Sequence, residues 1–153
     1  MASVPPKGTL GSMFENLLRN PMTIVATGLL QSFLPQAMLG RPARRAFFSR
    51  DLPDERLRKY LARMQPESHR AILQLTKPIQ SSWQPREKTP ILVIGGERDT
   101  LVQEKFIRET ADHYGTSAWI CPEVAHVMFL DTNWRNVTAH LVKWLDERLA
   151  DHC

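Results

Sequence analysis

The stretch TPILVIGGERD, residues 89–99, contains four consecutive apolar residues followed by two glycines and a polar segment. The apolar run ILVI at 91–94 is rich in β-branched residues and has no polar position, so it predicts a strand that is buried on both faces. Such strands are typical of parallel sheets that lie between layers of helices. Gly95 and Gly96 are expected to end the strand, and residues 97–100 to form a polar loop.

The residues after this loop alternate between helical and strand patterns. Apolar residues at helical spacing predict a helix that ends near Gly115; they are Val102, Phe106, Ile107, Ala111 and Tyr114. The segment AWIC at 118–121 predicts a second short strand, stopped by Pro122, and residues 134–149 predict a closing helix. This order predicts one right-handed crossover unit with parallel strands, followed by the closing helix.

The first half of the chain has a different pattern, in which apolar residues recur at helical spacing between prolines. No strand is expected there. We expect short helices around 13–18, from Pro21 to before Pro35, from about Pro53 to 64, and from Pro66 to 75. A polar connector follows at 84–90. The sequence therefore predicts an α/β fold, in which a helical cap or lid, residues 1–83, precedes the C-terminal part of a core, residues 84–153.

The composition limits the classes of protein. The chain has 153 residues, 42% of them hydrophobic, and a formal net charge of +4, which permits acidic partners without requiring them. Its two cysteines, Cys121 and Cys153, make no disulfide framework, so a reducing compartment is expected and the protein is predicted to be cytoplasmic. The apolar segment 22–39 is interrupted by two glutamines and a proline, so neither a membrane span nor membrane binding is expected.

Two further classes of partner are not expected. Arginines gather in the helical half, but their spacing fits a solvated surface, so we expect no nucleic-acid binding; they stand at 41, 44, 45, 50, 56, 58 and 63. No two histidines have the spacing of a zinc site, so neither a metal nor another cofactor is expected.

Polar side chains follow both predicted strands. Glu97 and Asp99 come after the first strand, and His126 lies in the loop after the second. Because the carboxyl ends of parallel strands meet at one edge of a sheet, we expect Asp99 to lie within about 2.6–3.2 Å of a ring nitrogen of His126. A carboxylate in that position fixes the tautomer of the imidazole and stabilises its charged form. Glu97 is the alternative acid.

The motifs around these residues resemble those of the α/β-hydrolase-fold superfamily. Residues 89–99 resemble the segment that leads to the catalytic acid, VAHVMFLD at 124–131 resembles the histidine loop, and the closing helix and the helical cap have counterparts in that family. The resemblance implies that Asp99 is the acid and His126 the general base of a serine hydrolase. It also implies that the substrate is a small molecule with an ester or related acyl bond.

The chain departs from the family in one respect. The G-x-S-x-G nucleophile elbow and the H-G-G-G oxyanion loop are both absent from the sequence, and the strands that carry them in the family would precede Met1. Cys121 closes a predicted buried strand, where a thiol is normally inert. Asp131 is expected to cap the closing helix.

Two function classes follow from this departure. In the first, the chain belongs to an enzyme whose N-terminal half is supplied in trans or in a longer product. In the second, the chain is a non-catalytic remnant that acts as a scaffold or interaction module. The isolated chain is expected to show no triad-type hydrolysis, and to be poorly stable or to self-associate, because two strands are few for an independent sheet.

Overall fold

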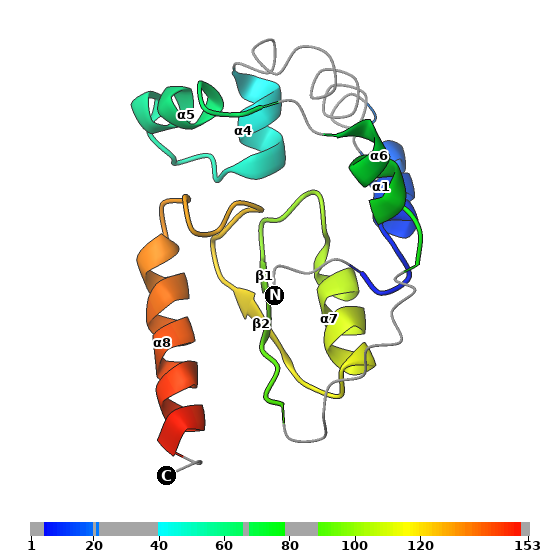
Figure 1. Ribbon diagram of the computed structural model, residues 1–153. Helices are drawn as coiled ribbons and strands as arrows, with labels where there is room; N and C mark the ends of the chain where they lie inside the picture. Colours follow the sequence, from blue (N-terminus) through cyan, green and yellow to red (C-terminus); the bar gives the residue numbers. More distant parts are fainter. Residues whose placement is uncertain (1–4, 20, 22–39, 66–67, 79–88, 151–153) are drawn as a thin grey trace.

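The computed structural model describes residues 5–19, 21, 40–65, 68–78 and 89–150, and it has a mixed α/β arrangement (Figure 1). Its sheet consists of β1 (Val93–Gly96) and β2 (Ala118–Cys121), which are parallel and pair from Val93 with Ala118 to Gly96 with Cys121. The helices in the described ranges are α1 (Leu10–Arg19), α4 (Arg41–Phe47), α5 (Asp54–Leu61), α6 (His69–Leu75), α7 (Glu104–His113) and α8 (Trp134–Ala150).

The parallel pairing and the crossover through α7 confirm the arrangement predicted for the second half of the chain. The helix α7 ends where the sequence places its stop, since Gly115 adopts a positive φ of 64° just beyond it. The two strand faces are buried against different helices: Val93 packs with Phe106 and Ile107 of α7, whereas Ile94 packs with Val137 of α8. This alternation is why the run at 91–94 contains no polar residue.

The boundaries predicted for the first strand are wrong by two residues. The strand begins at Val93 and includes both glycines, which were expected to end it. A Cβ at Gly95 would lie 2.1 Å from Cδ1 of Ile107, so the absence of a side chain lets α7 pack directly on the strand backbone. The glycines therefore serve close packing inside the strand.

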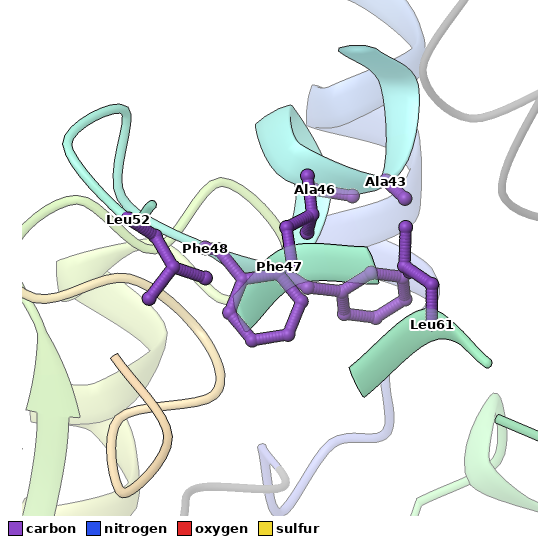
Figure 2. Packing of buried hydrophobic residues seen from close by; sticks show 7 residues of the cluster. Ala43, Ala46, Phe47, Phe48, Leu52 and Leu61 are labelled. Atoms are coloured by element: carbon purple, nitrogen blue, oxygen red, sulfur yellow. The ribbon is translucent and has the colours of Figure 1, made fainter. Parts of the chain in front are cut away.

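The helical half contains α4, which the sequence analysis did not predict. This helix begins after Gly40 with a proline in its first turn, and its buried face contributes Ala43, Ala46 and Phe47 to a core of its own. Figure 2 shows these side chains meeting Phe48, Leu52 and Leu61, the last of which comes from α5. Leu101 and Val127, from the second half, are partly buried and pack against the same cluster, so the two halves are in apolar contact there.

The helix α1 has its polar side buried. Its apolar residues Phe14 and Leu18 are exposed, whereas Ser12 and Asn16 are buried. The apolar face of this helix therefore does not form core among the described residues. The helix expected between Pro21 and Pro35 lies outside the described residues. Of the helices in the described ranges, none combines the length and apolarity needed to cross a membrane.

Candidate functional site

The site lies at the edge of the sheet where both strands end, beneath α4 (Figure 1). Backbone hydrogen bonds join the two loops that leave this edge: the N–H of Glu97 donates to the carbonyl of Cys121, and that of Arg98 donates to the carbonyl of Val124, each at 2.9 Å. The acid loop and the histidine loop are thus held against each other as a unit.

Asp99 and His126 are in direct contact. Nδ1 of His126 lies 2.9 Å from Oδ2 of Asp99, which is the contact expected from the sequence. The other oxygen, Oδ1, accepts the backbone N–H groups of Leu101 at 2.8 Å and Val102 at 2.9 Å. Both carboxylate oxygens therefore have hydrogen-bond partners, and the two backbone N–H groups fix the orientation of the carboxylate relative to the imidazole.

The two partners differ in their access to solvent. The side chain of Asp99 is 5% exposed and that of His126 is 34% exposed. An ionised carboxylate can only accept, so the contact requires a proton on Nδ1 and leaves Nε2 of the neutral ring as an acceptor. Nε2 has no hydrogen-bond partner among the residues that the structure describes. The arrangement presents one proton acceptor, oriented by a shielded acid.

The cap contributes directly to the surroundings of His126. The ring of Phe47 lies 6.1 Å from the imidazole, centroid to centroid, with the planes tilted by 53°. The carbonyl of Phe47 accepts the N–H of Val127 at 3.0 Å. On the acid side, the hydroxyl of Thr100 donates to the carbonyl of Arg45 at 3.1 Å. The C-terminal end of α4 therefore touches both loops of the site.

Charged residues at the rim have other partners. Oε2 of Glu97 accepts the backbone N–H of Glu123 at 2.9 Å, and no bond joins Glu97 to His126 in the described part of the chain. Arg98 pairs with the carboxylate of Glu123 and approaches Asp51 of the cap to 4.0 Å. The geometry therefore favours Asp99 over Glu97 as the acid that serves the imidazole.

Asp131 does not have the role expected for it. Its side chain is fully buried and accepts hydrogen bonds from Ser49, Ala125 and Thr132. The helix α8 begins only at Trp134, and none of these side-chain bonds reaches its first turn. The expectation of a helix cap is wrong, because the carboxylate is directed inward, to the histidine loop and the cap.

Other reactive groups lie apart from this pair. Cys121 is buried, and its burial raises the pKa of the thiol from 9.0 to about 11, which keeps it protonated and inert. None of the described serine hydroxyls bonds to His126: those of Ser12 and Ser49 donate to other acceptors, and that of Ser68 accepts from the N–H of Ala71. No three metal-ligating side chains come together within the described ranges.

Sequence reasoning missed the residues that the cap places at the site, Phe47 and Ser49. A signal for the helix was present, since Pro42 stands in a first turn and Ala43, Ala46 and Phe47 follow at helical spacing. Nothing local indicates that the end of this helix meets a loop about 80 residues further along the chain.

Comparison with other proteins gives no match: no family model, no curated protein and no solved structure is similar to this chain.

Proposed function

We propose that this chain carries the acid and the general base of an α/β-hydrolase-like serine hydrolase that acts on esters or related acyl substrates. Asp99 is the acid and His126 the base. The nucleophile and the oxyanion donors come from residues outside this chain, supplied in trans or in a longer product. No cofactor takes part in this chemistry.

One observation carries the proposal: the 2.9 Å contact between Asp99 and His126 at the carboxyl edge of two parallel strands. Ligand sites of open α/β sheets lie at this edge. The order of acid before histidine along the chain is the order found in α/β hydrolases. The shielded acid and the accessible imidazole also suit a base that must meet an external hydroxyl.

The chemistry available to the pair follows from its protonation. With the proton held on Nδ1 by Asp99, Nε2 can take the proton of a hydroxyl placed against it, and the imidazolium that forms is stabilised by the carboxylate. The same proton can then be returned to the leaving group. The pair alone forms no acyl intermediate, because the hydroxyl must be provided.

The second candidate, a non-catalytic scaffold or interaction module, is favoured by a different observation. Large apolar side chains are exposed on α1 and α6, including Leu10, Phe14, Leu18 and Leu73. An open apolar hollow of about 540 Å³ also lies between the sheet and α8, lined in part by Ile94, Phe129 and Trp144. Surfaces of this kind favour association with another chain or with a second copy.

The decisive experiment begins with the coding region upstream of Met1, read in frame and in neighbouring frames for a G-x-S-x-G elbow. The product carrying the elbow is then prepared together with this chain, and each is also prepared alone. Hydrolysis is measured on esters of increasing acyl length, and size by light scattering. We expect turnover only from the combination, and self-association of this chain alone.

Variants identify the source of any turnover. Asp99→Ala and His126→Ala are expected to reduce kcat/KM of the combination by at least about 10³-fold. His113→Ala is the matched control, because His113 is an exposed histidine of α7 whose ring packs on Tyr114, and it should leave the rate unchanged. A stable monomer of this chain that hydrolyses esters, and loses that activity in both variants, would refute an external nucleophile. A monomer without turnover and without an upstream elbow would favour the scaffold.

A further inference from the structure

We infer that Asp131 and Ser49 are positioning residues for His126, and that the helical half thereby sets the orientation of the imidazole against Asp99. The inference concerns the same site and rests on the proposed function for its catalytic meaning. It assigns to the cap a second task, besides covering the site.

Asp131 is a buried carboxylate with several donors around it. It is 0% exposed, and Ser49 is 2% exposed. The hydroxyl of Ser49 donates to Oδ2 of Asp131 at 2.6 Å, and the backbone N–H of Ser49 lies 3.2 Å from both carboxylate oxygens. Burial of an ionised carboxylate is costly unless donors such as these compensate for the lost water. The donors around Asp131 therefore suit an ionised carboxylate.

The same carboxylate holds the backbone next to His126. Oδ2 of Asp131 accepts the N–H of Ala125 at 2.8 Å, and Ala125 immediately precedes His126. On the other side, the N–H of Val127 donates to the carbonyl of Phe47 at 3.0 Å. The N–H groups of both residues that flank the histidine in sequence are thus anchored, that of Ala125 by Asp131 and that of Val127 by the end of α4.

These anchors leave the imidazole little freedom. With the neighbouring residues held on both sides, the backbone of His126 is restricted, and Asp99 engages the ring at Nδ1. Loss of one anchor allows the loop to shift, and a shift of about 1 Å is enough to weaken a hydrogen bond or cost catalytic rate. Because Ser49 belongs to the helical half, the packing of that half against the sheet also orients His126.

A role in packing alone predicts a different result. In that case, loss of the Ser49 hydroxyl would lower stability and leave the tautomer of His126 as it was. A positioning role predicts that the folded variant keeps its structure while His126 loses its fixed Nδ1–H form. The tautomer is visible in the ring ¹⁵N chemical shifts, with no need for an active enzyme.

The test is therefore NMR of His126 in the full chain, for the wild type and four variants. Ser49→Ala removes the hydroxyl, and Asp131→Asn places an amide among backbone donors. Asp99→Ala removes the acceptor of the ring N–H. Thr110→Val is the matched control, because Thr110 is equally buried but donates its hydroxyl to the carbonyl of Phe106 in its own helix.

We expect the wild type and Thr110→Val to show one Nδ1–H tautomer, and Ser49→Ala and Asp131→Asn to lose it in favour of a mixture. The inference is overturned if the folded Ser49→Ala chain keeps the wild-type signature, or if Thr110→Val loses it as well. Ser49→Ala decides the matter if Asp131→Asn does not fold.

Asp99→Ala separates this inference from the proposed function. If Asp99→Ala abolishes the signature and Ser49→Ala does not, the acid–base pair stands and the positioning role falls. If Asp99→Ala leaves the signature unchanged, Asp99 does not hold the proton on Nδ1, and the proposed function fails together with the inference.

Discussion

Gly96, the last residue of β1, lies close against the backbone of the histidine loop. A Cβ at this position would lie 2.3 Å from the carbonyl oxygen of Val124, a backbone atom that has no side-chain freedom to move away. At Gly95, by contrast, the nearest atoms belong to the side chain of Ile107. The second glycine therefore permits the approach of the loops, whereas the first permits the approach of α7.

Gly96→Ala is accordingly expected to push the histidine loop away from β1. We predict a loss of about 1–3 kcal/mol in the free energy of unfolding, typical of overpacking in a core. Urea denaturation measures this loss, and the Nδ1–H signature of His126 should weaken in the same variant. Gly11→Ala is the control, because its Cβ meets only the edge of the Phe106 ring at 3.2 Å. Equal stability of the two variants would contradict the close approach.

The thiol of Cys121 gives a prediction for alkaline pH. Burial raises its pKa from 9.0 to about 11, so the unfolded chain releases this proton at a lower pH than the folded chain. Between these two values the folded state binds more protons, and the free energy of unfolding should fall as pH rises. The contribution is complete below pH 9.0 and lost as pH rises through about 11.

The measurement uses a Cys153→Ser background, in which Cys121 is the remaining thiol. Urea titrations at about pH 8 and about pH 10 should show the decline, and Cys121→Ala should reduce it. A thiol reagent should modify the native chain at least about tenfold more slowly than the unfolded chain at about pH 8. Rapid labelling of the native chain would show that the thiol is accessible and would make Cys121 a candidate nucleophile.

Among the elements, α1 shows how tertiary contacts override an amphipathic pattern. Its polar residues face the loop before α7: Asn16 donates to the carbonyl of Leu101 at 3.1 Å and accepts from the side chain of Gln103 at 2.7 Å. Ser12 also bonds the carbonyl of Leu101. The loop that follows the acid offers polar backbone groups that need partners, and the polar face of α1 supplies them.

The orientation of α1 is tested by two substitutions with opposite expectations. Asn16→Leu should lower the free energy of unfolding by about 1–3 kcal/mol, because it strands buried polar partners. Leu18→Gln should change it by less than about 0.5 kcal/mol, because Leu18 is exposed. Both effects are measured by urea denaturation. The reverse ranking would mean that the apolar face of α1 is buried, as its periodicity alone suggests.

The short helix α4 illustrates how much a single element can position. Seven residues, Arg41–Phe47, bring a buried face to the cap core, a carbonyl to Val127 and an aromatic ring to His126. Ser49 follows in the next turn of chain and reaches Asp131. An isolated helix of this length would not be stable in water, so its position depends on these tertiary contacts.

At the scale of the whole molecule, the cap and the sheet are joined at the site itself. The cap core packs against Leu101 of the acid loop and Val127 of the histidine loop. Hydrogen bonds from Thr100 to Arg45, and from Ser49 to Asp131, cross between the same two parts. Movement of the cap relative to the sheet would therefore disturb the contact between Asp99 and His126. The stability of this junction and any activity of the pair are linked for that reason.

The sequence by itself determined the second half of the fold and the meeting of Asp99 with His126. An apolar run without polar positions specifies a strand buried on both faces, and parallel strands bring their carboxyl ends to one edge whatever the details of packing. These rules are local or topological, so they can be read from residues 89–131 alone. The boundary of β1 was misplaced, because glycine usually marks the end of a strand and here allows close packing.

Tertiary structure alone decided how the cap meets the site. Three features depend on contacts between residues more than 70 positions apart. They are the burial of Asp131, the contacts of Ser49 and Phe47 with the histidine loop, and the inward polar face of α1. No periodicity encodes such pairs, since a polar residue on a helix has the same local pattern whether it faces water or a backbone carbonyl. The choice between the two is made by the partners that the folded chain brings to each face.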